Sequence, residues 1–165
     1  MIRLASIVIV IGACGRLGFD EVSTDPDGVG ELLFFQYPTE DLVALAGSGA
    51  LGPAWHAGVR LPAGTGASGV AIRDRRPVLS DDIFNDPRIP LTEEIRGRLT
   101  AGAFPAVLAV PIVFRDQAIG ALSIGRPKGR TFQGDEIRMA QAFASQAALA
   151  LENARATTEL RAAKE

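Results

Sequence analysis

The strongest hydrophobic pattern in the chain is a pair of nearly continuous apolar runs, at residues 106–114 and 118–125, joined by the polar residues 115–117. A run that is apolar on both of its alternating faces is typical of a strand covered from both sides. We therefore expect two neighbouring strands near the centre of a sheet. Pro111 lies inside the first run, and because proline lacks a backbone N–H we expect a β-bulge there.

Shorter apolar runs predict further strands. Residues 32–36 and 42–46 flank the polar stretch 37–41, which is the pattern of a hairpin. Residues 78–80 follow Arg76 and Pro77 and predict a third short strand. Together with the two long runs, these segments indicate a mixed α+β domain in which glycine and proline mark the connections.

Two segments have helical patterns. Residues 91–101 combine acidic residues near the start with basic residues further on, and Gly102 is the expected stop. Residues 135–163 predict one long helix without an internal proline. Charges alternate beyond Glu152, so residues 156–165 are expected to begin a helical linker.

The long helix carries two rows of small and apolar residues. One row is expected to cover the domain's own sheet: Met139, Phe143, Ala147, Ala150 and Ala154. A second row is expected to form a dimer interface with another copy of the helix: Ala140, Ala144, Ala147, Leu151 and Ala154.

The first 28 residues allow three interpretations. Arg3, the apolar residues 4–11 and then Cys14 fit a lipoprotein-type signal, with Cys14 as the lipidated residue. Gly12, Gly15 and Gly18 could form a dinucleotide loop, but the polar, turn-rich residues 19–28 lack the helix that this loop requires. The remaining interpretation is an apolar element packed on the core.

A second glycine motif stands at Gly64, Gly66 and Gly69. Its spacing matches the dinucleotide fingerprint, but the preceding strand candidate ends in Pro62. Only residues 70–73 could be helical before the break at Arg76 and Pro77. We therefore interpret these glycines as a structural entry into one short helical turn.

Composition excludes several classes of protein. The chain has 165 residues, 47% of them hydrophobic, and a net charge of −2, which argues against disorder and against binding to nucleic acid. One cysteine and one histidine cannot build a His/Cys zinc site or an internal disulfide. Ser68, Ser80 and Ser123 have only His56 as a candidate base, so no hydrolytic triad is predicted.

An ordered series of motifs resembles the GAF domain family over residues 61–155. It includes the 64–69 glycine motif, Arg76-Pro77-Val78, Asp86-Pro87-Arg88, the apolar stretch 108–112 and the helical stretch 143–155. The resemblance implies a GAF-like fold, related to profilin and PAS domains. This fold has a central antiparallel sheet of five to six strands, helices packed on one face, a ligand pocket closed by loops on the other, and a long C-terminal helix. Residues 29–155 would form the domain. Residues 1–28 stand where the family has its first helix, and we expect that helix to be missing.

The same resemblance implies a non-catalytic sensory module of signal-transduction proteins. Such modules bind a small molecule, mediate dimerisation, or do both, and they act on an output domain such as a histidine kinase. We expect a cytoplasmic homodimer joined by the C-terminal helix and no enzyme activity, because the chain carries no output or catalytic domain. The alternatives are a ligand-free dimerisation module of the same fold, and a membrane-anchored lipoprotein if Cys14 is lipidated.

The resemblance also places a candidate ligand pocket, whose residues would be Asp81, Asp82, Phe84, Arg88, Leu99 and Phe104. Arg88 could clamp an anionic ligand group, or it could form an internal ion pair with Asp82 that pins the loop. The cofactor stays unidentified. Covalent bilin is disfavoured because Cys14 is the only cysteine and precedes the matched region, and haem would depend on the lone His56.

Overall fold

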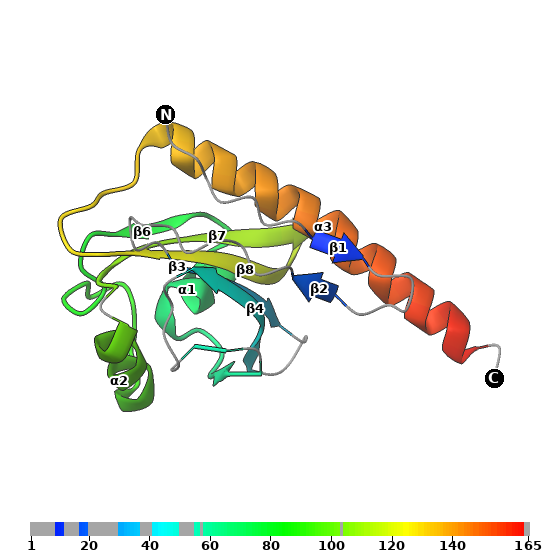
Figure 1. Cartoon of the computed structure of the whole chain (residues 1–165), viewed down its shortest axis with the longest axis horizontal. Coiled ribbons are helices and arrows are strands. Elements are labelled where there is room, and N and C mark those ends of the chain that lie inside the picture. Colours follow the sequence, from blue (N-terminus) through cyan, green and yellow to red (C-terminus); the bar gives the residue numbers. More distant parts are fainter. Residues whose placement is uncertain are drawn as a thin grey trace.

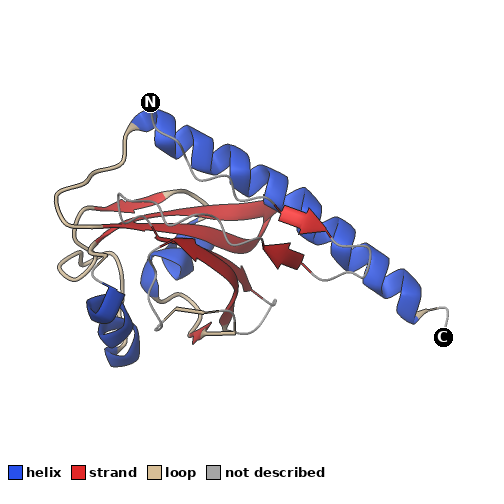
Figure 2. Cartoon of the chain, in the orientation of Figure 1, coloured by secondary structure: helices blue, strands red, loops and turns tan. Residues whose placement is uncertain are grey.

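A computed structural model describes residues 9–11, 17–19, 30–36, 41–49, 55–56, 58–102 and 104–163. These residues form a six-stranded sheet, a separate two-stranded sheet and three helices, the last of them long (Figures 1 and 2). The elements, in chain order, are β1 (Ile9–Ile11), β2 (Leu17–Phe19), β3 (Gly30–Gln36), β4 (Leu42–Gly49), β5 (Arg60–Leu61), α1 (Gly66–Asp74), β6 (Val78–Ser80), α2 (Glu93–Gly102), β7 (Ala106–Phe114), β8 (Gln117–Arg126) and α3 (Gly134–Ala162).

The large sheet is antiparallel throughout and has the strand order β5-β4-β3-β8-β7-β6. The two long apolar runs form β7 and β8, which pair with each other from Ala106↔Arg126 to Phe114↔Gln117. The hairpin predicted from residues 32–46 is formed by β3 and β4, and the short run at 78–80 is β6. The predicted α+β class and antiparallel sheet are therefore confirmed.

Pro111 is accommodated in β7 without a bulge of its own. It pairs with Ala121 in regular register, and the irregularity comes one step later, between Ile112 and Val113. On the other side of β7, the strand β6 pairs only as far as Ala109. Among the described residues no strand pairs with β7 at Pro111 on that side, so its missing N–H costs no strand hydrogen bond there.

The sheet is covered on both faces, as alternation along β7 requires. Leu108, Val110 and Ile112 point to one face and pack in an apolar cluster with the alanines of α3. Val107 and Ala109 point to the other face and pack against α1. The helices are thus divided between two faces, whereas the resemblance implied that they all pack on one. Figure 1 shows α3 crossing the sheet on one side, with α1 and α2 on the other.

The 64–69 glycine motif is the entry to a buried helix. Gly64 and Gly66 have positive φ angles of 74° and 66°, which strain residues with a side chain. A Cβ on Gly69 would lie 2.6 Å from the backbone carbon of Gly64, so the helix packs directly on the turn before it. The structural interpretation of these glycines holds, but α1 is a nine-residue helix rather than one short turn.

The faces of α3 differ from the prediction. Ala140, Ala144, Ala147 and Leu151, predicted as a dimer interface, are at most 9% exposed and pack on the domain's own sheet. Of the row predicted to cover that sheet, Phe143 and Ala147 do pack against it, but Met139 is 42% exposed. The reason is that alanines permit the close approach of α3 to the large aliphatic side chains of β7, so the small-residue row is the one that fits the sheet.

The N-terminal segment is described only in part. Ile9–Ile11 pairs with Leu17–Phe19 as a small antiparallel sheet, and β1 contacts α3. Cys14, Gly12 and Gly15 lie outside the described residues, and so does most of the region in which the family's first helix was expected. In the described part of the chain, no helix has the length and apolar character needed to cross a membrane.

Candidate functional site

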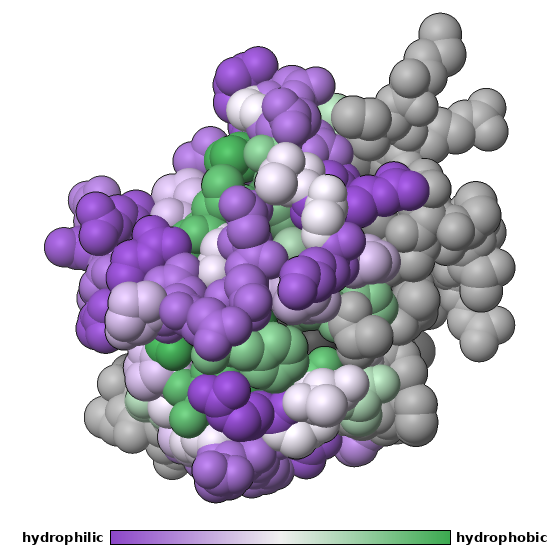
Figure 3. Space-filling view, turned by 90° about the vertical axis from the view of Figure 1, so that its left-hand side faces the viewer, coloured by the Kyte–Doolittle hydropathy of each residue, from purple (hydrophilic) through white to green (hydrophobic). Residues whose placement is uncertain are grey.

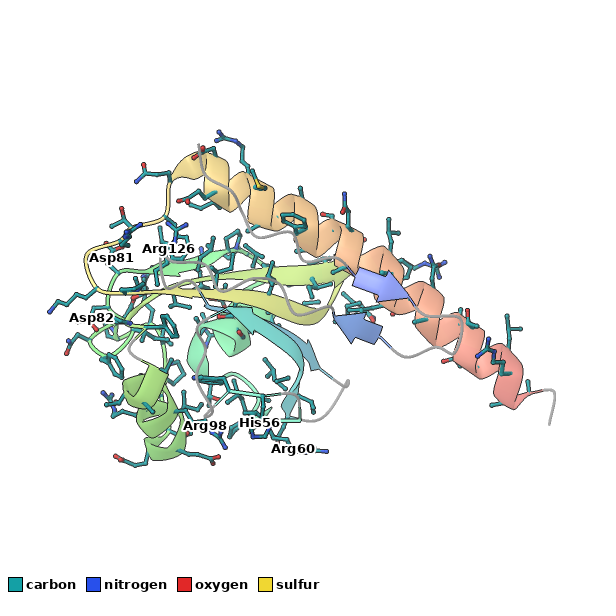
Figure 4. All side chains as sticks on the ribbon, in the orientation of Figure 1. His56, Arg60, Asp81, Asp82, Arg98 and Arg126 are labelled. Carbon is teal, nitrogen blue, oxygen red and sulfur yellow. The ribbon has the colours of Figure 1, made fainter. Side chains whose placement is uncertain are left out.

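The loop between β6 and α2 contains four of the six predicted ligand residues: Asp81, Asp82, Phe84 and Arg88. Most hydrogen bonds of its polar side chains are to other groups of the same loop. Asp82 accepts hydrogen bonds from the backbone N–H of Phe84 at 3.1 Å and from the side-chain amide of Asn85 at 2.9 Å. This is an Asx-type turn, in which a short carboxylate side chain replaces a backbone partner. Asp81 is exposed beside it, at the end of the sheet seen in Figure 4.

Arg88 forms a forked ion pair with Asp86. Its Nε donates to Oδ1 of Asp86 at 2.9 Å and its Nη2 donates to Oδ2 at 2.6 Å. Nη2 also donates to the carbonyl oxygen of Leu79 at 2.8 Å, which ties the loop to β6. The hydrogen bond from Arg88 holds the pKa of the Asp86 carboxyl well below its ordinary value.

The sequence prediction of an Asp82–Arg88 ion pair was therefore wrong about the partner, because Asp82 is occupied by the turn. The loop is still pinned by Arg88, but through Asp86, whose side chain is 9% exposed against 64% for Arg88. An anionic ligand could reach the exposed guanidinium only in competition with, or beside, this carboxylate.

Of the three apolar residues of the predicted pocket, Phe104 is buried in the hydrophobic core, and Phe84 and Leu99 are partly buried against it. Phe104 is 7% exposed, and a Cβ added to Gly125 would lie 2.9 Å from its Cβ. Phe84 packs at the edge of the cluster around α1, with the guanidinium carbon of Arg96 5.8 Å from its ring centre. Leu99 contacts both that cluster and the one containing Phe104. The structure thus brings Leu99 together with Phe84 and with Phe104, while Asp81, Asp82 and Arg88 stay at the surface loop.

A second group of residues, which the sequence analysis did not select as a site, borders the cluster that contains Phe104. Trp55 is buried there with Ile95 of α2 and Leu42 of β4. His56 and Arg60 are exposed next to this cluster, and Arg98 of α2 donates to Glu94 at 3.0 Å. Figure 4 places His56, Arg60 and Arg98 along the same lower side of the molecule. The only sequence signal for this region was the Trp55-His56 pair.

The side of the molecule that carries α2 is largely polar at its surface. Figure 3 shows charged and polar side chains over most of this face, with apolar surface visible between them. The partly buried apolar residues here include Phe84, Leu91 and Leu99. Among the described residues, no group of three or more His, Cys, Asp or Glu side chains is arranged to hold a metal ion.

A buried ion pair connects the sheet to the start of α3. Nη2 of Arg126, at the end of β8, lies 2.5 Å from Oε1 of Glu136. The other carboxylate oxygen of Glu136 accepts the backbone N–H of Gln133 at 2.8 Å, closing the first turn of the helix. Arg126 also stacks on the ring of Phe132 at 4.4 Å and donates to the carbonyl of Thr131 at 3.1 Å.

The connection between Arg126 and Glu136 was not among the features predicted from the sequence. The spacing of Gln133 and Glu136 before an apolar helix is a capping-box pattern, so the cap could have been predicted. Its bond to Arg126 could not, because the two residues meet only when β8 and the 127–133 loop are folded. The bond from Arg126 lowers the pKa of Glu136, so this buried carboxyl stays ionised.

Comparison with known proteins agrees with this architecture. The GAF domain family model matches residues 13–152, which is most of the chain. The chain is therefore a member of the GAF domain family, the sensory and regulatory modules of signalling proteins.

Solved structures support the same fold. The GAF domain of a phosphoenolpyruvate-protein phosphotransferase from Coxiella burnetii is 21% identical, with a TM-score of 0.67, covering 81% of this chain and 77% of that one. The GAF-B domain of DevS from Mycobacterium smegmatis is 27% identical, with a TM-score of 0.61, covering 79% and 85%. The blue-light-absorbing form of the PixJ GAF domain from Thermosynechococcus elongatus is 23% identical, with a TM-score of 0.59, covering 81% and 80%.

Proposed function

We propose that this domain is a non-catalytic regulatory module of a signal-transduction protein, which senses a small molecule on one face of its sheet and passes the response on through α3. The observation that carries the proposal is the two-sided packing of β7. Val107 and Ala109 contact α1, while Leu108 and Val110 contact α3. A displacement of α1 or of the 81–92 loop would therefore move the side chains of β7 that pack directly against α3.

Tight packing makes such transmission physically reasonable. Leu108, Val110 and Ile112 have no exposed surface, and Ala140 of α3 has none either. Close-packed interiors transmit strain because they contain few voids into which a side chain could move. The ion pair of Arg126 with Glu136 fixes where α3 begins, so that a movement of β8 would turn or shift the helix as a unit.

The six pocket residues from the sequence remain the candidate ligand contacts, with Arg88 as the anion-binding group. Its guanidinium is 64% exposed and already arranged in a fork by Asp86. The Nε proton and both Nη2 protons of Arg88 are donated to Asp86 and Leu79, so a carboxylate or phosphate would bind the two N–H groups of Nη1. Phe84, on the same loop, would supply apolar contact to the ligand.

The test is ligand-induced thermal stabilisation, measured with succinate, citrate, inorganic phosphate and AMP as probes. A probe present at about a hundred times its dissociation constant stabilises the folded state by ~2.7 kcal/mol, or several degrees in Tm. Arg88→Ala should abolish this gain. Arg76→Ala is the control, because Arg76 is also an exposed arginine with an aspartate neighbour but lies outside the loop. If none of the four probes stabilises the wild type, sensing of a small anion is rejected.

A second candidate function is a ligand-free structural module of the same fold. The close approach of Phe104 to Gly125 favours it, because this aromatic ring fills space where the pocket was predicted. In that case Phe104→Ala would only destabilise the domain, by about 3–5 kcal/mol, and would create no site for the probes.

Partners and localisation are part of the same proposal. We expect a cytoplasmic homodimer that acts on an output domain such as a histidine kinase, in a longer chain or in a partner protein. The alternative of a membrane-anchored lipoprotein depends on Cys14, and mass spectrometry of the protein purified from membranes would detect the lipid.

A further inference from the structure

Among the described residues, the three with a side chain and a positive φ angle lie together at one end of the large sheet. They are Arg75 at 52°, Arg115 at 48° and Asp116 at 64°. Arg75 follows the last residue of α1, while Arg115 and Asp116 form the two-residue turn that joins β7 to β8. Nη1 of Arg75 donates a hydrogen bond to the carbonyl oxygen of Asp116 at 3.1 Å, so the two turns are in direct contact.

Both turns contain residues that raise the conformational energy of the backbone. A helix that ends in the left-handed conformation usually has glycine there, and the favoured two-residue hairpin turn is Asn-Gly. Residues held in such conformations gather at functional sites, where their side chains are needed. The side chain of Arg75 joins the two turns, but no described residue accepts a hydrogen bond from Arg115. Folding alone therefore does not account for an arginine at position 115.

The surface around the two turns is basic, although the chain as a whole is acidic. It carries four arginines and two aspartates, which is a local charge of +2 in a chain of net charge −2. Arg73 and Asp74 neutralise each other through a forked ion pair, with Nε to Oδ1 at 2.7 Å and Nη2 to Oδ2 at 3.2 Å. Arg76 lies 3.8 Å from the same carboxylate, and its side chain is 75% exposed. Arg75, Arg76 and Arg115 therefore keep N–H groups available at the surface.

Apolar surface lies beside these arginines. Val113 is 39% exposed although it belongs to β7. The strand β6 pairs with β7 only as far as Ala109, so no described strand covers Val113 on that side. The guanidinium carbon of Arg115 lies 5.2 Å from the ring centre of Phe114, which orients the cation. Arginine beside exposed apolar and aromatic side chains is typical of the centre of a protein–protein interface.

We propose that this surface binds an acidic segment of a partner protein, which carries at least two carboxylates and an apolar side chain. We call it the arginine surface; it consists of Arg75, Arg76, Val113 and Arg115. Each guanidinium would donate N–H groups to a carboxylate, and the apolar side chain would pack on Val113. Arg88 is not part of the arginine surface, so the proposal goes beyond the proposed function and does not depend on it.

Two of the arginines are held in place before any partner binds. Arg75 is fixed by its hydrogen bond to Asp116, and Arg115 by its contact with the ring of Phe114. Side chains that are already ordered lose less conformational entropy on binding. Figure 1 shows α3 passing this end of the sheet and continuing beyond it, so a partner bound here would lie near the helix that carries the proposed response.

The pattern of charges favours a protein partner over nucleic acid or a lipid surface. Asp74 and Asp116 stand among the arginines and would repel a phosphate backbone, and specific binding to DNA commonly takes about six to ten phosphate contacts. Anionic lipids are recognised by clusters of roughly four to eight basic residues. A protein segment can place its carboxylates against the arginines and keep them away from the two aspartates.

Fluorescence anisotropy with a labelled probe peptide tests the arginine surface. The probe EDLFEDLE combines carboxylates with apolar side chains, and the control peptide QNLFQNLQ replaces every side-chain carboxylate by an amide. The wild type should bind the acidic probe at low salt with a dissociation constant of about 10–100 µM, as expected of a small, transient interface. The control peptide should bind at least ~10-fold more weakly. Equal binding of the two peptides, or no binding of the acidic probe at ~1 mM, would overturn the proposal.

Substitution of Arg115 by glycine separates binding from folding. Glycine adopts a φ angle of 48° without strain, so Arg115→Gly should raise the Tm by about 2–4 °C. The same variant should raise the dissociation constant of the acidic probe at least ~10-fold. Arg76→Gln, which alters neither turn, should raise it about fivefold. An unchanged dissociation constant in Arg115→Gly would reject a role of this arginine in binding.

Arg138→Ala is the matched control for the loss of one positive charge. Arg138 is exposed in the first part of α3, which begins next to Arg126 at the opposite end of β8 from the 115–116 turn. This variant should leave the dissociation constant of the acidic probe nearly unchanged. A loss equal to that of Arg115→Gly would show that the probe responds only to the overall charge of the protein, and the proposal would be wrong.

The arginine surface and the sensing proposal can fail separately. Arg88→Ala should leave binding of the acidic probe unchanged, and Arg115→Gly should leave the stabilisation by the small anionic probes unchanged. A DNA duplex of about 20 base pairs and vesicles containing phosphatidylserine represent the other classes of partner. If either one binds more tightly than the peptide, and does so through Arg115, the surface recognises phosphate and the acidic protein segment is rejected.

Discussion

Arg126 and Glu136 form the most buried ion pair among the described residues, with side-chain exposures of 13% and 6%. Arg126 ends β8, and Glu136 lies in the first turn of α3. The pair therefore ties the central strand of the sheet to the helix that extends furthest from it. The backbone N–H of Gln133 and the ring of Phe132 complete the surroundings of the two charges.

Removing one partner of this pair should cost far more than removing a nearby surface charge. Arg126→Ala leaves the Glu136 carboxylate buried without its counter-charge, and we expect a loss of about 3 kcal/mol in the free energy of unfolding. Asp135→Asn is the control, because Asp135 is exposed on the same helical turn and contributes about 0.3–1 kcal/mol through the helix dipole. Urea denaturation measures both, and equal losses would contradict the prediction.

The free energy of unfolding should decrease at acid pH. The pKa values of Glu136 and Asp86 are both lowered in the folded state, in each case mainly by a hydrogen bond from an arginine. A lowered pKa contributes stability in full above the unfolded value, about 4, and this contribution is lost as the pH drops toward the folded value. The urea midpoint should be level down to about pH 5 and then decrease. Glu136→Gln should flatten part of this decrease, and an unchanged profile in the variant would argue against the pair.

Replacing either of two helical glycines, Gly69 or Gly97, by alanine should change the stability of the protein in opposite directions. Gly69→Ala would place a Cβ 2.6 Å from the backbone of Gly64, and the resulting strain should destabilise the fold by about 1–3 kcal/mol. Gly97 of α2 has no atom within 4 Å of the added Cβ. Gly97→Ala should therefore stabilise the protein by about 0.5–1 kcal/mol through helix propensity. Thermal denaturation distinguishes the two, and a tolerated Gly69→Ala would contradict the packing seen at α1.

Leu151 lies on the buried face of α3 and Leu149 on its exposed face, so substitutions at these two positions distinguish the faces. Leu151 is 9% exposed in the cluster beneath the helix, so Leu151→Asp should destabilise the monomer by more than ~3 kcal/mol. Leu149→Asp, at 59% exposure, should change the stability of the folded protein by less than about 1 kcal/mol. Circular dichroism at low protein concentration measures the first effect, and a folded, stable Leu151→Asp would reverse the assignment of the faces.

Much of the fold follows from local sequence. The runs at 106–114 and 118–125 are apolar on both faces and are separated by only three residues, so pairing is nearly unavoidable. The long helix from residue 135 is equally local, since no proline or glycine interrupts it before Ala162. The series of family motifs extended the prediction of the fold to the whole domain, because the motifs occur in the same order as the strands and helices of the family.

The candidate site was predicted less well, for a physical reason. Arg88 was correctly expected to pin its loop, but the choice between Asp82 and Asp86 depended on which carboxylate the backbone turn had already occupied. Phe104 was selected as a pocket residue, and its burial follows from the missing side chain of Gly125, which lies 21 residues further along the chain in β8.

The sequence by itself determined the β3–β4 hairpin, the long strands β7 and β8 and the long helix α3, because hydrophobic periodicity acts within a few residues. Only the tertiary structure decided which face of α3 meets the sheet. Both rows on that helix have helical spacing, so spacing alone does not choose between them. The large aliphatic side chains of β7 fit against the alanines of one row, and Leu149 and Leu160 are left exposed. The bond between Arg126 and Glu136 was decided in the same way, since it joins two elements whose contact the sequence does not encode locally.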